Sequence, residues 1–420
     1  MAVIPRWLRY SCLALSFAIA PVAQAELKEN PKTLVDEVWQ IINSQYVDSQ
    51  FNQTDWLAVR EDLLAREYDD NGEAYAAIRA ALKELGDPYT RFLTPAQYED
   101  LTTKTSGELT GVGIRYRQDE ATSQLRVLET LTGSPADTAG VRAGDSITRI
   151  NGKPTALMTL EEVSSEFEGE EGSVVKLQIS RSGNVFDVSL TRAFIEVVSV
   201  QYELKQAGAF PIGYIHVDEF SSHAAEQMQA ALKELTTEGA EGLVLDLRGN
   251  PGGLLFSSVD IARMFLKQGN IVRTVDRENP EDRRYWANNT AITQLPLVVL
   301  VDQRSASASE ILAGALQENS RAKVVGSRTF GKGTVQSVHD LVDGSGLTVT
   351  IARYYPPSGK DINKRGIAPD VTVNLSTRQQ RRLSQNPELR ATVDDPQFVR
   401  ALQVLQVSRL SEPAEQATQH

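Results

Sequence analysis

The sequence predicts a multidomain fold of mixed α/β and α+β class, with a helical N-terminal region, a β-rich domain and a βαβ-containing core. Apolar residues recur at helical spacing from Pro31 to about Leu101, and short alternating stretches broken by glycines follow from about Lys104. From about Ile212, strands and helices alternate, which indicates βαβ crossovers and a mainly parallel sheet. The predicted segments are 1–25, 26–104, 105–195, 196–375 and a C-terminal tail at 376–420.

The first 25 residues are typical of a secretory signal peptide, because arginines precede an apolar stretch that closes on Ala-Gln-Ala25. A permanent membrane anchor is the alternative, but a span needs about 20 apolar residues, and Ser16 and Pro21 interrupt this stretch. We therefore expect an exported protein that is soluble after cleavage. The only cysteine, Cys12, lies in the removed segment, so the predicted mature chain forms no disulfide and no thiolate metal site.

Composition and charge narrow the function classes. The chain has 41% hydrophobic and 23% charged residues, as in an ordinary folded protein, and a net charge of −12. Its basic residues are scattered among acids, which argues against binding nucleic acid. The four histidines form no His-Glu-x-x-His motif, and we expect neither a metal nor a cofactor.

The N-terminal region contains two groups of apolar residues at helical spacing, and one helix from Thr159 to Phe167 interrupts the glycine-rich strands that follow. The N-terminal helical positions are Leu34, Val35, Val38, Ile41 and Ile42, then Ala74, Ala77, Ile78, Ala81 and Leu82. The predicted strands of the core are 212–217, 242–247, 297–301 and 323–326, and its predicted helices are 224–235, 254–266 and 307–316. A further helix is predicted at 396–405 in the polar tail.

Ligands of such sheets bind beyond the carboxyl ends of the strands, where loops lead into helices. One of these loops carries Ser307 in Ser305-Ala-Ser-Ala-Ser-Glu310, and Lys332 follows 25 positions later in Thr329-Phe-Gly-Lys-Gly-Thr-Val-Gln336. A serine hydroxyl needs a base to become a nucleophile, and a desolvated neutral lysine can be that base. The pair suggests a serine nucleophile with a lysine base.

Each member of the pair has a simpler interpretation. Ser307 begins Ser-x-x-Glu310, a capping box at a helix start, although a helix N-terminus also suits an oxyanion. Lys332 completes most of a phosphate-binding loop that starts at Gly326, but Gly333 replaces the hydroxyl residue that would bind magnesium. An exposed turn lysine is the remaining alternative.

The neighbouring residues permit the catalytic interpretation. Gln336 lies four residues after Lys332 and could hydrogen-bond its amine, although it could equally face solvent. The loop Asp246-Leu-Arg-Gly-Asn-Pro-Gly-Gly253 offers backbone N–H groups for an oxyanion, from Gly252 or Gly253, and Ala308 N–H could supply the second donor. A tight strand-to-helix turn would also explain the glycines.

These motifs together resemble the carboxyl-terminal processing peptidases, as does Asp361-Ile-Asn-Lys-x-Gly-Ile-x-Pro-Asp370. The resemblance covers roughly 31–375. It implies a serine endopeptidase in which Ser307 is the nucleophile, Lys332 the general base and Gln336 its orienting partner. It further implies oxyanion donors at Gly253 and Ala308 in preference to Gly252.

The glycine-rich region at about 105–195 resembles a PDZ domain, with Gly111-Val112-Gly113-Ile114 as its carboxylate-binding loop. The resemblance implies a protein substrate with a free C-terminal tail, because PDZ domains bind a peptide as an added strand. Many family members have a basic residue near Phe167-Glu-Gly169, whereas this chain has Glu168.

Three other segments, 38–48, 51–56 and 106–113, resemble the photosynthetic branch of the family. That branch trims the photosystem II reaction-centre precursor, which implies a membrane-bound substrate and a location in the thylakoid lumen or periplasm. The alternatives are a general periplasmic tail-specific protease and, from another class, an inactive PDZ adaptor. The sequence sets no oligomeric state.

Overall fold

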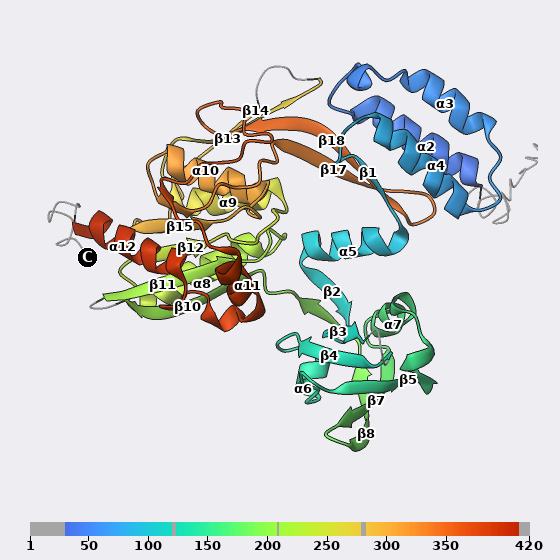
Figure 1. The fold of residues 1–420 in the computed structure, drawn as a ribbon, viewed down its shortest axis with the longest axis horizontal. Helices are drawn as coiled ribbons and strands as arrows, with labels where there is room; N and C mark the ends of the chain where they lie inside the picture. Colours follow the sequence, from blue (N-terminus) through green and yellow to red (C-terminus); the bar gives the residue numbers. More distant parts are fainter. Residues whose placement is uncertain (1–29, 120–122, 208–209, 279–282, 411–420) are drawn as a thin grey trace, which may run out of the picture.

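The computed structural model describes residues 30–119, 123–207, 210–278 and 283–410 (Figure 1). The predicted signal peptide, with Cys12, lies outside these residues. Within the described ranges, none of the helices has the length and apolarity that a membrane span requires. The mixed fold class is confirmed: a helical N-terminal region, a β-rich domain and a parallel α/β core follow one another along the chain.

The N-terminal region is a group of three helices packed on an antiparallel sheet (Figure 1). Asn30, Asp55 and Asp70 cap the helix starts with their side chains, as short polar residues do. Buried apolar residues of the helices contact Leu347 and Val349 of the sheet. The helices are α2 (Pro31–Gln45), α3 (Trp56–Ala65) and α4 (Asn71–Glu84), and a short 3-10 turn, η1, covers Phe51–Gln53.

The sheet beneath these helices joins the N-terminal region to the core. A short strand from the N-terminal region, β1 (Arg91–Leu93), pairs with the long strand β18 (Gly346–Tyr355). The strand that follows Lys332, β17 (Thr334–Asp340), also pairs with β18. The remaining strands are β13 (Asn270–Asp276) and β14 (Arg283–Trp286), and the order is β1-β18-β13-β14.

The β-rich domain projects from the rest of the molecule and is reached through α5 (Pro95–Ser106) and the paired strands β2 (Glu108–Gly111) and β9 (Ala193–Glu196) (Figure 1). Its sheet has the order β3-β4-β5-β7-β8, and the apolar side of the sheet packs against α7 (Leu160–Phe167). The strands are β3 (Ile114–Gln118), β4 (Leu125–Thr130), β5 (Ser146–Ile150), β7 (Val174–Arg181) and β8 (Asn184–Thr191), with β6 (Lys153–Pro154) beside β5 and α6 (Pro135–Thr138) and η2 (Thr155–Leu157) in the connections.

The core is a six-stranded sheet in which five strands run parallel. Alternate residues of each central strand enter opposite hydrophobic clusters, so the strands are apolar throughout. The strand order is β10 (Val200–Ala207), β11 (Phe210–Val217), β12 (Leu243–Asp246), β15 (Leu297–Val301), β16 (Lys323–Gly326) and β19 (Val371–Thr372). Helices α8 (Ala224–Thr237), α9 (Leu255–Phe265) and α10 (Ala308–Glu318) pack on one face.

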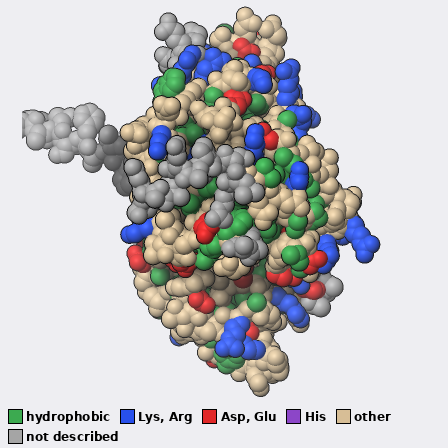
Figure 2. Space-filling view, turned by 90° about the vertical axis from the view of Figure 1, so that its left-hand side faces the viewer, with side chains coloured by type: hydrophobic (Ala, Val, Ile, Leu, Met, Phe, Trp, Pro, Cys, Tyr) green, Lys and Arg blue, Asp and Glu red, His purple; other side chains and the backbone are tan. Residues whose placement is uncertain are grey.

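The C-terminal segment covers the other face of this sheet. Phe398, Ala401 and Leu405 of α12 (Pro396–Leu410) are buried against the strands. The predicted helix at 396–405 is therefore confirmed, and it extends further. Between β19 and α12 lie α11 (Thr377–Gln385) and η3 (Pro387–Leu389). On the face of the molecule shown in Figure 2, basic and acidic side chains are interspersed among polar and apolar ones.

Candidate active site

Ser307 lies at the start of α10, beyond the carboxyl end of β15, where the sequence predicts it. Its backbone has φ 54° and ψ −114°, a strained conformation for a residue with a side chain. The preceding residues are held firmly, because the Ser305 hydroxyl donates to the Leu247 carbonyl (2.7 Å) and Ala306 N–H donates to the Asn250 carbonyl (3.0 Å). The loop is therefore anchored to the neighbouring glycine-rich loop.

The Ser307 hydroxyl makes no cap hydrogen bond. Instead, the Glu310 carboxylate accepts the Ser307 N–H (3.0 Å), and the Glu310 N–H donates to the Ser307 carbonyl oxygen (2.8 Å). The Tyr354 hydroxyl also donates to that carbonyl oxygen (3.1 Å). The helix start is thus organised through the serine backbone, and the hydroxyl is left for other chemistry.

Glu310 connects the serine to the lysine loop. One carboxylate oxygen accepts N–H bonds from both Ser307 (3.0 Å) and Lys332 (2.8 Å), so the two backbones meet at a single atom. The other oxygen accepts the Thr329 hydroxyl (2.5 Å) and Gly331 N–H (2.8 Å). Burial raises the pKa of this fully buried carboxyl group, and these hydrogen bonds oppose the shift. The sequence identified Glu310 only as part of a capping box.

The Lys332 side chain lies against the N-terminal region. Its Nζ is 5.0 Å from the centroid of the Tyr89 ring. Burial, followed by the nearby positive charge of Arg91, lowers the pKa of Lys332 to about 8, while Asp87 and Glu310 oppose the shift. The sequence predicts a lowered pKa, but it predicts neither the Tyr89 ring nor the Arg91 charge near the amine, because both residues lie about 240 positions away in a segment without a readable motif.

Gln336 lies on β17, four residues after Lys332. Its amide nitrogen donates to the hydroxyls of Thr334 (2.8 Å) and Thr350 (3.3 Å). Among the described residues, no hydrogen bond joins the side chains of Ser307, Lys332 and Gln336 to one another. The amide is nevertheless oriented, because its nitrogen is occupied and its oxygen is left as an acceptor.

The two loops also bring backbone N–H groups together. Gly252 N–H is already used by the Asn250 side chain (2.8 Å), whereas neither Gly253 N–H nor Ala308 N–H donates to a described residue. Gly252 instead provides space, since a Cβ atom there would lie 2.8 Å from the Cβ of Ser307. Gly253 is held by Phe220, whose N–H and carbonyl bond the residues on either side of it.

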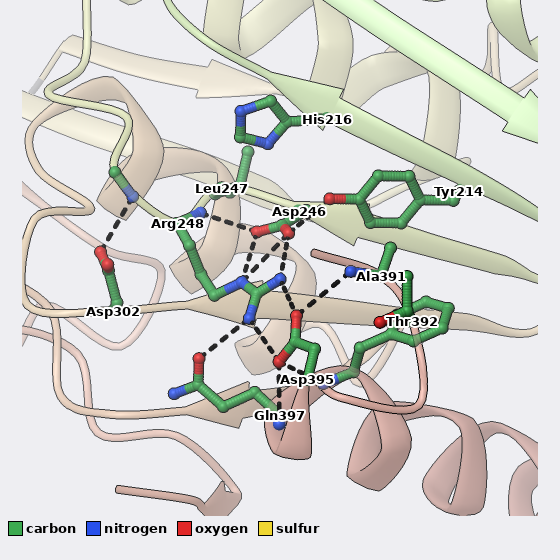
Figure 3. A network of polar contacts seen from close by, with 12 residues as sticks. Tyr214, His216, Asp246, Leu247, Arg248, Asp302, Ala391, Thr392, Asp395 and Gln397 are labelled. Atoms are coloured by element: carbon green, nitrogen blue, oxygen red, sulfur yellow. Dashed lines mark hydrogen bonds and ion pairs between the residues drawn. The ribbon is translucent and has the colours of Figure 1, made fainter. Parts of the chain in front are cut away.

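A buried ion network supports the glycine-rich loop from the other side (Figure 3). The Arg248 guanidinium contacts Asp246 (2.6 Å) on β12 and Asp395 (2.8 Å) ahead of α12. Gln397 accepts a further bond from it (3.1 Å), and the Tyr214 hydroxyl donates to Asp246 (2.7 Å). Burial alone would raise the pKa of Asp246, but the Arg248 charge lowers it to about 2.

The predicted carboxylate-binding loop begins the β-rich domain. Val112 is buried and its carbonyl accepts Ala136 N–H (3.0 Å), and Gly113 has φ 73°. Gly111 ends β2 and Ile114 begins β3, the strand at one end of the described sheet. The four residues therefore form one turn leading into an edge strand.

Glu168 lies beside this turn, bridging to Gly111 through the backbone. Its side chain accepts the Ser164 hydroxyl (2.9 Å). Burial and the Glu99 carboxylate of α5 raise the pKa of Glu168 to about 7. This chain thus has an acid beside the turn whose raised pKa leaves it partly protonated near neutral pH. Elsewhere in the described residues, no group of three or more His, Cys, Asp and Glu side chains could hold a metal ion.

A parallel α/β core with a strained serine, a half-buried lysine whose backbone shares the Glu310 carboxylate with it, and an attached PDZ domain defines a class of serine peptidase. Peptidase family S41 matches residues 211–373, and the PDZ domain family matches 126–181. The chain belongs to the carboxyl-terminal-processing proteases, a serine peptidase family.

Several relatives show this membership. A carboxyl-terminal-processing protease of Picosynechococcus is 42% identical over 86% of this chain and 87% of its own. The chloroplastic C-terminal processing peptidase of Tetradesmus obliquus is 39% identical over 85% of this chain and 80% of its own.

Among solved structures, a photosystem II D1 C-terminal processing protease shares 39% identity and a TM-score of 0.53, covering 82% of this chain and 93% of its own. A putative S41 protease from Bacteroides fragilis has a TM-score of 0.54 at 18% identity, with coverage of 90% and 98%, and shares the fold.

Proposed function

We propose that Ser307 and Lys332 carry out the peptidase reaction through an acyl-enzyme. Neutral Lys332 Nζ takes the proton from Ser307 Oγ, which attacks the carbonyl carbon of the scissile peptide bond. The C–N bond then breaks, and the Lys332 ammonium returns the proton to the departing amine. The neutral Lys332 Nζ next takes a proton from a water molecule, which attacks the ester carbonyl. The ester bond breaks, and Lys332 returns the proton to Ser307 Oγ, which restores the enzyme.

The observation that carries this proposal is the shared Glu310 carboxylate, which holds the Ser307 and Lys332 backbones together. The N–H groups of Gly253 and Ala308, which donate to no residue in the described part of the chain, suit the developing oxyanion better than that of Gly252, which already has a partner. The Gln336 amide oxygen is left to accept a bond from the lysine amine. The alternative hypothesis, an inactive PDZ adaptor, would be favoured if Ser307, Lys332 or Gln336 were replaced. All three residues are present in this chain, which supports the enzyme.

The substrate is proposed to be a protein whose C-terminal tail is captured by the loop from Gly111 to Ile114. An edge strand, β3, directly follows that loop and can accept the tail as an added strand. Cyanobacterial and chloroplastic relatives support the photosystem II reaction-centre precursor as the substrate. The residues at 1–25 support export to the thylakoid lumen or periplasm.

The test uses the mature chain and a precursor with its C-terminal extension, with products identified by mass spectrometry. Ser307→Ala should lower turnover by about a millionfold, whereas Ser320→Ala, at an exposed serine, should retain it. A Ser307→Ala protein that still trims the precursor would overturn the mechanism. Equal cleavage of unrelated periplasmic proteins with free tails would replace the photosystem assignment with a general tail-specific protease.

A further inference from the structure

The turn that leads into β1 brings the N-terminal region to the proposed base. We propose that Tyr89 is a positioning residue for the Lys332 amine and that Arg91, two residues further along the same turn and strand, adds a positive charge near it, so that the N-terminal region completes the active site. This inference rests on the proposed role of Lys332 and goes beyond it, because it assigns part of the catalytic environment to a region outside the peptidase core.

The turn is built to hold Tyr89 in one place. The Asp87 carboxylate accepts the Tyr89 N–H (3.0 Å) and the Thr90 hydroxyl (2.7 Å). The Tyr89 carbonyl accepts the Thr348 hydroxyl (2.8 Å), and the Thr90 hydroxyl oxygen accepts the Thr350 N–H (3.1 Å). Thr348 and Thr350 lie on β18, which also pairs with β17, the strand that begins just after Lys332. The turn and the lysine loop are thus fastened to the same strand.

The Tyr89 ring lies against one side of the Lys332 amine. Its centroid is 5.0 Å from Lys332 Nζ, so the face of the ring packs against the amine. The Tyr89 hydroxyl makes no hydrogen bond to a described residue, so its contribution comes from the ring. A ring in this position limits where the amine can move and keeps water from that side.

Arg91 supplies an uncompensated positive charge. It is exposed, and its side chain forms no ion pair or hydrogen bond with a described residue. The other charged or titratable groups near the amine are Asp87, Glu310 and the phenols of Tyr89 and Tyr354. Asp87 and Glu310 favour the ammonium form, whereas Arg91 opposes it. Removing the Arg91 charge therefore shifts the balance toward an amine that cannot accept a proton.

The experiment measures kcat and KM of the full mature chain against pH for two variants of Arg91 and two variants of Tyr89. In the pH profile of kcat/KM, Arg91→Gln should move the rising limb to higher pH by about half a pH unit, which is the shift expected from removing one exposed charge. Arg91→Lys keeps the charge and should leave the rising limb in place. Added salt should move the wild-type limb in the same direction and the Arg91→Gln limb much less. Coincident limbs for wild type and Arg91→Gln would overturn the role of Arg91.

For the ring, Tyr89→Phe should keep the wild-type rate, whereas Tyr89→Leu should lower kcat about tenfold with little change in KM. Full kcat in a folded Tyr89→Leu protein would overturn the role of Tyr89. The controls are Ser307→Ala and Lys332→Ala. If either control is active, the proposed mechanism itself is overturned. If both controls are inactive but Arg91→Gln keeps the wild-type pH profile and Tyr89→Leu keeps the wild-type kcat, only this inference is overturned.

Discussion

At the scale of single residues, the half-buried Lys332 is kept at a cost to stability. Its pKa falls from 10.5 to about 8 in the folded protein, through burial and then the Arg91 charge. The proposed mechanism requires the neutral form of Lys332, so kcat/KM should rise as pH increases through about 8. Lys332→Arg should be inactive, because a guanidinium does not lose its proton in this range. A flat profile between pH 6 and 9 would contradict a lysine base.

The same shift predicts a stability change. Between about pH 8 and 10.5 the unfolded chain binds more protons at Lys332 than the folded chain, so folding is favoured as pH rises through this window. Below pH 8, Lys332→Met should therefore be inactive yet more stable by about 1–3 kcal/mol. Urea unfolding at pH 7 and pH 10 measures this. The gain should shrink at pH 10, and an equal gain at both values would assign it to packing instead.

Glu310 is the residue on which both loops depend. Glu310→Gln would place an amide NH₂ against N–H donors that now bind a carboxylate oxygen. We expect a loss of about 2–4 kcal/mol in unfolding free energy and at least tenfold in kcat. Glu226→Gln, at an exposed first-turn position of α8, is the matched control and should change stability by less than about 0.5 kcal/mol. Similar losses in both variants would contradict the assigned role of Glu310.

At the scale of elements, the strands that are buried on both faces of the sheet are predicted best from the sequence. The strands at 297–301 and 323–326 were expected with their observed bounds, because continuous apolar runs between turns define them. Strands β13, β17 and β18 were not predicted, since polar residues interrupt their apolar runs. In addition, β18 pairs with β1 and β13, which lie far away in the chain. Local motifs indicate Ser307 and Lys332 as the candidate catalytic pair, whereas no local motif indicates Tyr89, Arg91 or the connecting role of Glu310.

The PDZ loop and Glu168 give a prediction for the β-rich domain. With Ser307→Ala enzyme, a peptide with a free C-terminus should bind more tightly than its amidated form. Binding should weaken from pH 6 to pH 8, because Glu168, with its pKa raised to about 7, becomes a carboxylate beside the loop that is proposed to receive another carboxylate. Calorimetry checks this. Glu168→Gln should remove most of the pH dependence, and an unchanged dependence would locate it elsewhere.

Substitutions at two glycines distinguish a steric clash in that loop from the backbone strain that any side chain causes at positive φ. Gly113 and Gly133 both have positive φ, but a Cβ atom at Gly113 would lie 2.3 Å from the Cβ of Ser134, whereas space at Gly133 is open. Gly113→Ala should therefore abolish tail binding, and Gly133→Ala should weaken it little. Equal effects would show that strain alone matters.

At the scale of the whole molecule, the C-terminal segment is part of the peptidase core rather than an appendage. The sequence of 376–420 appears polar and without motifs, since Asp395 and Gln397 acquire meaning only when α12 packs on the sheet and reaches Arg248 (Figure 3). Arg248 belongs to the loop that ends at Gly253, so the end of the chain holds the proposed oxyanion donor in place.

Adjacent aspartates test this connection. Asp395 is buried and binds the Arg248 guanidinium with both oxygens (3.0 and 2.8 Å), whereas Asp394 is exposed and contacts Arg382 (3.2 Å). Asp395→Asn leaves a buried arginine partly unpaired and should lower the unfolding free energy by about 3–5 kcal/mol. Asp394→Asn should cost less than about 1 kcal/mol. Urea unfolding gives both values, and kcat should fall in Asp395→Asn alone, because only that change releases the loop carrying Gly253.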